Sequence, residues 1–358
     1  MQLRPWPGWP AVGRLPVVSA TAISNAARPL RLGVSSCLLG AAVRYDGGNK
    51  RDRFLSDVLA PYVEWVPVCP EVEAGMGVPR EAVHLVGDPT APRMIGTRTG
   101  RDHTVAMRRF AAARVRALAA LDLCGYVFKK DSPSCGLERV RVYAASGTPP
   151  PSGASRRTRA SQAGGAPSRR GRGLFAAAFT AAYPSIPVEE EGRLQDPLLR
   201  ENFIERIFCY RRLRSLLVRP TRGALVAFHT AHECLILAHS PRAYAALGRL
   251  VTARGGARPA AHARRYGDGL MAALAVPATV TKHVNVLQHI AGFCRAHLSS
   301  GERRELATVI DDYRRGIVPL VVPIRLVRHH VERHDVAYMK TQVYLNPHPK
   351  ELMLRNHV

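Results

Sequence analysis

Residues 125–139 read GYVFKKDSPSCGLER, and the pattern of this stretch decides the fold class that we predict. A short β-like run (residues 126–128, YVF) leads through two lysines to a turn at residues 132–134 (SPS). Cys135 lies at that turn, and Gly136 allows the backbone to bend away after it. The stretch therefore predicts a β-strand that places a cysteine just beyond its carboxyl end.

Two further cysteines follow predicted strands in the same way. Residues 32–34 (LGV) lead to Cys37, and residues 63–68 lead to Cys69. In an open parallel sheet the carboxyl ends of the strands face one crevice, where α/β proteins place their chemistry. We therefore predict an α/β domain with a Rossmann-like parallel sheet, in which Cys37, Cys69 and Cys135 are neighbours that hold a metal cluster. The alternative, three small buried apolar residues, stays open.

The spacing of these cysteines is a weaker signal than their context. Separations of 32 and 66 residues match no zinc-ribbon or ferredoxin pattern. A trio of cysteines suits a [4Fe–4S] cluster in which one iron is free of protein ligands. Such an iron can act as a Lewis acid, and a soft sulfur atom is its natural guest.

Acidic and hydroxyl side chains beside the cysteines are candidates for proton transfer. Glu71 and Glu73 follow Cys69 in the loop CPEVEAGMGVPRE, and Ser132 stands three residues before Cys135. Ser132 is placed to donate a hydrogen bond to a bound base. Loop carboxylates are more often simply solvated, and a serine at a turn often only caps it, so both alternatives stay open.

The remaining cysteines and a histidine pair favour burial over metal binding. Four cysteines lie inside predicted strands or helices: Cys124, Cys209, Cys234 and Cys294. His229 and His232 would place two zinc ligands on one helix face, but the Glu of an HExxH motif is absent and no third ligand is evident. We favour core or RNA-facing positions for both histidines.

The charge balance points to a polyanionic partner. The chain has 52 Lys and Arg against 27 Asp and Glu, a net charge of +25, which attracts nucleic acid first and acidic membranes second. Abundant Arg and Ala also fit a GC-rich genome, which would inflate this charge. No apolar run reaches the ~20 residues that span a bilayer. With seven cysteines and no secretory leader pattern, we expect a soluble, cytoplasmic protein without a disulfide framework.

The length of 358 residues predicts two domains. Residues 1–30 contain no acid and predict a disordered basic extension. Residues 31–219 predict the α/β domain, interrupted at 146–173 by a basic, disordered insertion with six arginines and no acid. Residues 220–358 predict an all-α, RNA-binding domain. This second domain has 19 Lys and Arg against 9 Asp and Glu, a net of +10.

Helical periodicity supports this division. An apolar stripe along residues 101–121 predicts a helix, and Arg114 lies on that stripe, so we expect it to extend to solvent or meet a charge. A second helix is predicted from about Pro197 to Leu217. Ser299 and Glu302 form a possible capping box at the start of a helix in the second domain.

Several motifs together resemble a known family. CLLG with VRYDGG, CPEVEAGMGVPRE and KKDSPSCG are similar to the thiouracil desulfurase (TudS-like) domain. HTAHECLILAHS, NVLQHIAGF and QVYLNPHPKELMLRNHV are similar to the helical domain fused to it in RudS-type proteins. The resemblance covers residues 31–145 and 173–358, and this chain departs from the pattern at Glu233, where Lys is common.

The resemblance implies a [4Fe–4S] enzyme that converts 4-thiouridine in transfer RNA to uridine and sulfide. Carried over by motif, Cys37, Cys69 and Cys135 ligate three irons, and the thione sulfur binds the fourth. Glu71 would activate water or move protons at C4, and Ser132 would orient or protonate the base. The reaction would be hydrolytic, without net redox change, and the helical domain would bind the RNA.

Two other functions remain open. A desulfidase of free thiouracil or another small thiolated compound would use the same chemistry, although the second domain and the +25 charge argue against it. A non-catalytic nucleic-acid-binding protein with a structural cluster is the alternative from a different class.

Overall fold

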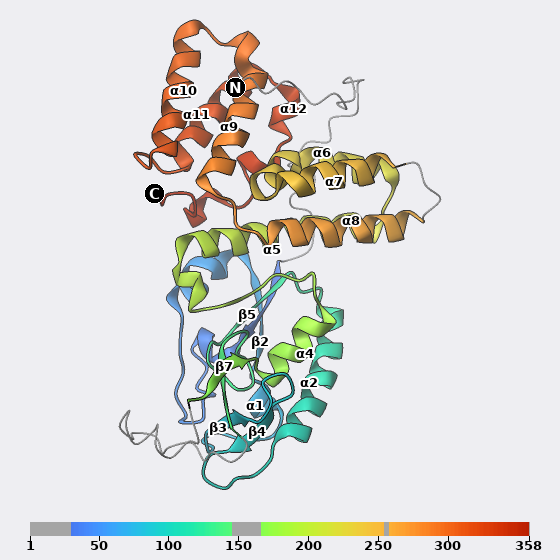
Figure 1. The fold of residues 1–358 in the computed structure, drawn as a ribbon, viewed down its shortest axis with the longest axis vertical. Coiled ribbons are helices and arrows are strands. Elements are labelled where there is room, and N and C mark those ends of the chain that lie inside the picture. The colour runs from blue at the N-terminus through green and yellow to red at the C-terminus, as the bar shows by residue number, and fades with distance from the viewer. Residues whose placement is uncertain (1–29, 145–165, 254–257, 358) are drawn as a thin grey trace.

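The computed structural model describes residues 30–144, 166–253 and 258–357 of the chain. Two four-stranded sheets with their helices form one end of the molecule, and a group of helices forms the other (Figure 1). The prediction of an α/β domain followed by an all-α domain is confirmed. The predicted basic extension lies outside the described residues except for Leu30, which is buried.

The first sheet is parallel throughout and has the strand order β2-β1-β5-β8. Its strands are β1 (Arg31–Ser35), β2 (Glu64–Val68), β5 (Gly125–Phe128) and β8 (Val188–Glu190). All four residues of β5 are buried, as expected for an inner strand of a parallel sheet covered on both faces. Because the strands are parallel, the segments that follow β1, β2 and β5 leave the sheet at one edge.

Aromatic side chains pack the first sheet against a helix that lies on one of its faces. Helices α2 (Thr104–Leu118) and α4 (Leu174–Ala182) lie side by side (Figure 1). The Tyr126 ring of β5 contacts Phe175 and Phe179 of α4, with ring centroids 5.9 and 4.9 Å apart. Burying rings of this size is a main source of folding free energy in a small α/β layer.

Short helices connect the strands. α1 (Pro70–Glu73) directly follows β2, and its Glu73 meets Arg114 of α2 at 3.0 Å, which confirms the expectation that Arg114 meets a charge. The other short helical turns are η1 (Ser36–Leu39), η2 (Phe54–Leu59), η3 (Ala60–Tyr62), η4 (Ala119–Leu121) and η5 (Arg193–Gln195).

A second sheet, absent from the sequence prediction, has the strand order β4-β3-β6-β7. Its strands are β3 (Val83–Val86), β4 (Arg93–Gly96), β6 (Val140–Tyr143) and β7 (Ser168–Gly171). β3 and β6 pair in parallel. The outer strands are antiparallel to their neighbours, with β4 paired to β3 and β7 paired to β6.

The prediction of a disordered insertion is wrong for the residues of strand β7. Residues 168–171 lie within the range 146–173 but pair with β6, with Ser168 opposite Val142. Pairing at a sheet edge uses backbone hydrogen bonds and needs no apolar side chain, so the exposed arginines of this strand do not prevent it. Gly171 also lets the strands approach, because a Cβ there would lie 2.4 Å from Val142 Cγ2. Residues 145–165 lie outside the described residues.

The other end of the molecule is built from helices and short helical turns in its described residues. They are α5 (Pro197–Val218), α6 (Arg222–His239), α7 (Pro241–Thr252), α8 (Pro259–Leu274), α9 (Val280–Cys294), η6 (Arg295–His297), α10 (Ser300–Arg314), α11 (Val321–Arg333), α12 (Ala337–Lys340), η7 (Val343–Leu345) and η8 (Lys350–Leu352). The predicted capping box of Ser299 and Glu302 begins α10. Among these described helices, none combines the length and apolarity that crossing a membrane requires.

Helix α5 joins the two ends of the molecule (Figure 1). Ile207 packs so close to β5 that a Cβ at Gly125 would lie 2.7 Å from its side chain. On the other side, Asn202 donates a hydrogen bond to the carbonyl oxygen of Leu274 in α8 at 2.9 Å. Because α5 packs against both parts, the domain boundary near Arg219 stays a prediction.

A buried charge cluster fastens the end of the chain to α5. Arg355 donates to Glu201 at 3.0 Å and to Glu205 at 2.5 Å, and all three side chains are buried. The second oxygen of Glu205 lies 3.1 Å from Nε2 of His239 in α6. Burial alone would raise the pKa of Glu205, but Arg355 and His239 hold it below its usual range.

Candidate active site

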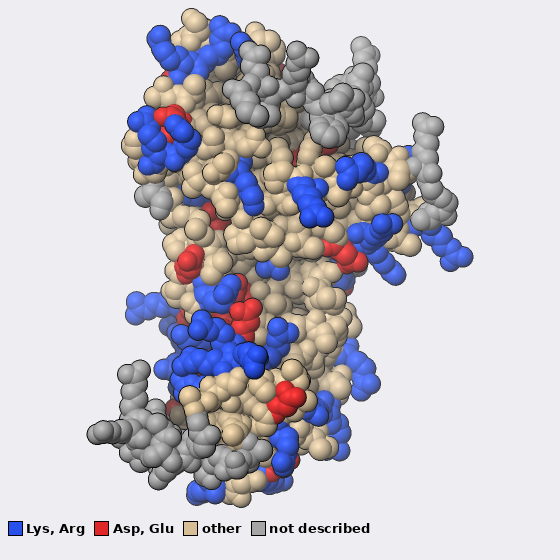
Figure 2. Space-filling model, viewed as in Figure 1, with Lys and Arg blue, Asp and Glu red and all other residues tan. Residues whose placement is uncertain are grey.

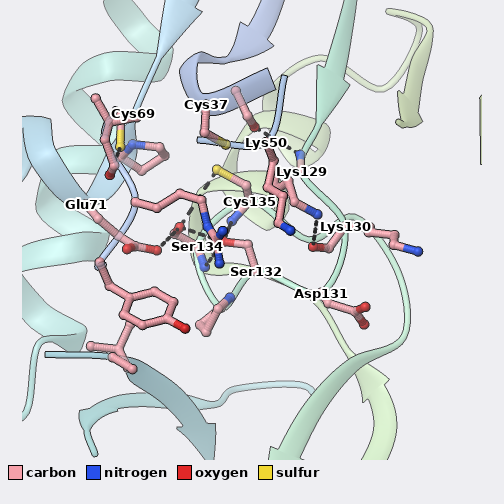
Figure 3. Close-up of a pocket in the computed structure, with 18 of the residues that line it drawn as sticks. Cys37, Lys50, Cys69, Glu71, Lys129, Lys130, Asp131, Ser132, Ser134 and Cys135 are labelled. Carbon is pink, nitrogen blue, oxygen red and sulfur yellow. Dashed lines mark hydrogen bonds between the residues drawn. The ribbon is translucent and has the colours of Figure 1, made fainter. Parts of the chain in front are cut away.

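A cavity of about 400 Å³ lies between the two sheets, at the carboxyl ends of β1, β2 and β5 (Figure 3). Ser35, Val68 and Lys129 line it from the ends of these strands, and His84 and Tyr143 line it from the second sheet. The parallel register places these ends together, because residues 32–34 of β1 pair with both β2 and β5.

All three predicted ligand cysteines line this cavity. Cys37 lies in the first turn after β1, Cys69 directly follows β2 as the N-cap of α1, and Cys135 lies in the turn after β5. Figure 3 shows the three side chains around one part of the cavity. Their proximity was predicted from the strand-then-cysteine pattern, and their role as ligands stays a prediction.

The turn that carries Cys135 is held by α4. Gly173, just before this helix, packs against the turn so closely that a Cβ would lie 2.5 Å from the carbonyl group of Ser134. The backbone N–H of Phe175 donates to the Ser134 carbonyl oxygen at 3.0 Å. The cysteine therefore has a backbone position fixed by the fold, as a preformed ligand site requires.

The thiols fit a multinuclear metal group better than a single ion. Burial raises the pKa of Cys37 to about 11 and also raises the pKa values of Cys69 and Cys135, so a bound cation is needed to hold them as thiolates. Within the described ranges, the one trio of potential ligands whose atoms all lie within 4.8 Å of one another is elsewhere. At least two of the three sulfurs are therefore more than 4.8 Å apart, whereas the sulfur ligands of one tetrahedral zinc ion, with Zn–S bonds of about 2.3 Å, lie closer together.

Glu71 faces the cavity and is bound at both carboxylate oxygens. Arg80 donates to its Oε2 at 2.5 Å and 3.0 Å, and Ser134 Oγ donates to its Oε1 at 2.7 Å. Arg80 is itself held by the carbonyl oxygen of Val43 at 3.1 Å. The carboxylate therefore has one orientation, which is what a proton-transfer group needs.

Ser132 connects to this carboxylate through a second serine. Its Oγ lies 3.0 Å from Ser134 Oγ and accepts the backbone N–H of Cys135 at 3.1 Å. Ser132 thus caps the turn and also begins a hydrogen-bonded chain that ends on Glu71 (Figure 3). Sequence reasoning missed Ser134 and Arg80; their only signal was their place in the motifs SPSC and GVPRE.

Basic side chains form much of the remaining wall. Arg44, Lys50, Lys129, Lys130 and Arg141 line the cavity, and Lys129 pairs with Glu191 at 2.6 Å. The wall therefore favours an anionic ligand, such as a phosphorylated one.

An aromatic pair completes the wall opposite the first sheet. His84 and Tyr143 pack edge to face with ring centroids 5.6 Å apart. Burial lowers the pKa of His84, which favours the neutral ring. Neutral aromatic groups of this kind are suited to contact the face of a planar base.

The other candidates behave as core residues. The four remaining cysteines are buried, as predicted: Cys124, Cys209, Cys234 and Cys294. His229 Nδ1 lies 3.0 Å from the hydroxyl of Tyr266, and His232 contacts the Phe228 carbonyl oxygen and Arg212. The core interpretation of the two histidines is therefore correct.

Residues 32–191, which contain every cysteine of the cavity, match the family described as 2-thiouracil desulfurase. This part of the chain belongs to the 2-thiouracil desulfurase family. Residues 234–349 match a second family, described as a protein of unknown function, DUF1722. The chain thus combines a desulfurase domain with a helical DUF1722 domain, as the resemblance implied.

Individual proteins match parts of the chain. The uncharacterized protein YbgA of Escherichia coli K12 is 34% identical over 153 residues, which are 42% of this chain and 90% of YbgA. The uncharacterized protein YbbK of Bacillus subtilis 168 is 30% identical over 108 residues, 29% of this chain and 71% of YbbK. A solved structure, the [4Fe-4S]-dependent thiouracil desulfidase TudS, is 27% identical and aligns with 46% of this chain and 93% of its own, with a TM-score of 0.35.

Proposed function

We propose that this protein is a [4Fe–4S]-dependent desulfidase that converts 4-thiouridine in transfer RNA to uridine and sulfide. The observation that carries the proposal is a single cavity lined by Cys37, Cys69 and Cys135 together with Glu71 and Ser132. Membership of the desulfurase family supports the reaction class. The tRNA substrate and the residue roles are the part that experiments must test.

The three cysteines would hold the cluster and leave one iron free of protein ligands. When bound, the cluster would supply a Lewis acid for the thione sulfur and a place for the sulfide that leaves. Lys129 lies close enough to oppose the rise in the Cys37 pKa, so it would help to keep that ligand as a thiolate.

Glu71 would take a proton from the water that attacks C4 of the base. Arg80 and Ser134 fix its carboxylate, and the chain from Ser134 to Ser132 gives a route by which a proton reaches the base. A C–O bond forms as the C–S bond breaks, so thione and water become carbonyl and hydrogen sulfide. No electron is gained or lost, and no reductant is needed.

The basic and aromatic lining of the cavity supports a nucleotide as its ligand. The cavity volume of about 400 Å³ is in the range of small-molecule sites. The rings of His84 and Tyr143 would contact the base, and Arg44, Lys50 and Arg141 would meet phosphates. A base inside a folded RNA must first leave its stack to enter such a cavity.

The charge distribution supports an RNA partner. We propose that residues 31–219 carry the reaction and that residues 220–358, with a net charge of +10, bind the RNA backbone. Figure 2 shows Lys and Arg side chains gathered over the region where β2, β5 and β7 lie in Figure 1. Phosphate contacts should make the affinity for tRNA fall steeply with salt, and an affinity independent of salt would contradict this role.

The decisive experiment uses anaerobically purified protein reconstituted with iron and sulfide. It is incubated with tRNA that contains 4-thiouridine while the thione absorbance and the cluster absorbance are followed. We expect the thione signal to disappear with the wild-type protein and to persist with the Cys37→Ala, Cys69→Ala and Cys135→Ala variants. If no cluster forms, the three cysteines are buried side chains and not ligands, and the proposal is refuted.

Free thiouracil is the second candidate substrate, since the matched family is described by it. The same preparation is therefore compared on free 2- and 4-thiouracil and on tRNA. A higher kcat/KM for tRNA supports the RNA assignment. Activity on the free base alone would mean that the enzyme acts on small thiolated compounds instead. A cluster and RNA binding without loss of either thione would identify a non-catalytic binding protein.

A further inference from the structure

Three potential metal ligands meet where the first turn of α10 lies against the end of α11, at the opposite end of the molecule from the sheets (Figure 1). One ligand atom from each of Glu302, His330 and His334 lies within 4.8 Å of the other two. His330 and His334 are four residues apart, so their rings lie on one side of the end of α11. Glu302 reaches them from the other helix.

His330 is a buried polar group for which the described part of the chain supplies no hydrogen-bond partner. The residue is 3% exposed, and neither ring nitrogen has a hydrogen-bond partner among the residues that the structure describes. Nε2 of His334 is also buried, and within the described ranges it has no hydrogen-bond partner either. Buried imidazole nitrogens are normally hydrogen-bonded, because leaving them unpaired is destabilising. Coordination to a cation would satisfy these lone pairs.

The electrostatics of the cluster also favour a cation. Glu302 supplies a negative charge, and its Oε2 accepts two hydrogen bonds from Ser299 at 2.8 Å, which fixes the carboxylate. The carboxyl end of α11 adds the partial negative charge of its free carbonyl groups. The opposing group is Arg333, which lies 3.4 Å from Glu302 Oε1, but its side chain is 58% exposed and free to turn away.

We propose that Glu302, His330 and His334 bind a divalent transition-metal ion, with Zn²⁺ as the best fit, and that the ion ties α10 to α11. Two imidazoles and one carboxylate are a donor set that zinc accepts, with the fourth position left for water. The nitrogen ligands select against Mg²⁺ and Ca²⁺, which prefer oxygen. This site is independent of the proposed desulfidase reaction.

Zinc binding is measured on the cluster-loaded full-length protein without a polyhistidine tag. In that state the thiols of the cavity are occupied, so they cannot supply the zinc site. We expect one equivalent of Zn²⁺ by calorimetry, and a melting temperature that rises with the Zn²⁺ concentration. With Co²⁺ as the probe, bound metal should lack the intense sulfur-to-cobalt absorption that thiolate ligands give.

Two variants test the ligands, and a third is the matched control. Glu302→Gln keeps the capping box, since Gln serves at this position, and His334→Gln changes a half-buried residue near the helix end. Each should weaken Zn²⁺ binding at least about tenfold, because even second-shell changes cost 10–100-fold. His329→Gln changes an exposed neighbour outside the trio and should leave the affinity unchanged.

Arg333→Gln provides a test in the opposite direction. Removing the cation that competes for Glu302 should tighten Zn²⁺ binding several-fold, a gain that loss of folding cannot imitate. The proposal is overturned if the protein binds no Zn²⁺, if the Co²⁺ spectrum shows thiolate ligands, or if Glu302→Gln and His334→Gln bind Zn²⁺ as tightly as the control.

Discussion

The cavity between the sheets and the charge cluster at the end of the chain both place acidic and basic groups close together, but they use them differently. In the cavity, Glu71 and Arg80 are paired at 2.5 Å while facing an open space of about 400 Å³. In the cluster, Arg355 is enclosed, and its guanidinium group donates hydrogen bonds to Glu201, Glu205 and the carbonyl oxygen of Tyr344.

The difference separates groups held for chemistry from groups held for structure. An enclosed ion pair has no access to a ligand, and its removal leaves an unpaired charge in the core. A paired carboxylate beside a cavity keeps a fixed orientation and can still reach a substrate. Variants in the first region should therefore change activity with little change in stability, and variants in the second should do the reverse.

The largest expected effect is on turnover, from Glu71→Gln. The amide keeps the size of the side chain but cannot accept a proton from water, so the rate of thione loss should fall about 10²–10⁴-fold. Cluster absorbance and tRNA affinity should stay at wild-type values. Glu64→Gln, at an exposed position in β2, is the matched control. Activity that survived in Glu71→Gln would remove this residue from the mechanism.

The second effect is on stability, from Arg355→Met. The change leaves Glu201 and Glu205 buried without their cation, which should lower the free energy of unfolding by about 3–5 kcal/mol. Urea or thermal unfolding measures this loss. Arg315→Met, which removes an exposed arginine paired with Asp311, should change stability by less than about 1 kcal/mol. Equal stability of both variants would show that the buried cluster contributes nothing.

The same comparison shows how far the sequence alone could lead. The three strand-then-cysteine units were predictable, because a parallel sheet brings the carboxyl ends of its strands to one edge whatever their separation in sequence. Contacts between side chains were not. Ser134 reaches Glu71 across 63 positions of the chain, and nothing in the local pattern of either residue indicates that bond.

The second sheet and the histidine trio were missed for physical reasons as well. Strand β7 (SRRG) has almost no apolar side chains and is held by backbone pairing, so its composition predicts disorder. His330 and His334 show only helical spacing in the sequence. Glu302 was recognised as a helix cap, and its second role depends on how α10 packs against α11.

A third prediction concerns the pH dependence of stability through Glu233, a partly buried acid of helix α6. Burial raises its pKa to about 7, although a hydrogen bond from Tyr338 acts in the opposite direction. The folded state therefore holds a proton that the unfolded state has lost, so stability present below about pH 4.5 is lost as the pH rises towards 7. Because Gln cannot ionise, the Glu233→Gln variant should not show this pH-dependent loss in the free energy of unfolding, which is on the order of 3 kcal/mol.

This direction is checked by measuring the free energy of unfolding of the wild type and of Glu233→Gln at several pH values between 4 and 8. The wild type should lose stability relative to Glu233→Gln as the pH rises. A residual slope in the variant is expected from Glu201, whose pKa is raised by burial and by the neighbouring Glu205. Parallel curves for the two proteins would mean that Glu233 is ionised in the folded state.

The smallest effect is expected from Ser134→Ala, which cuts the hydrogen-bonded chain between Ser132 and Glu71. The carboxylate keeps both bonds from Arg80, so it loses one of its supports and not its orientation. Turnover should fall about tenfold, which corresponds to about 1.4 kcal/mol for the lost hydrogen bond to Glu71, with KM for the thiolated substrate nearly unchanged. Ser132→Ala should cost more, since it removes the hydroxyl proposed to meet the base. If Ser134→Ala were instead as damaging as Glu71→Gln, the proton would depend on the serine chain, and Glu71 would act by orienting Ser134.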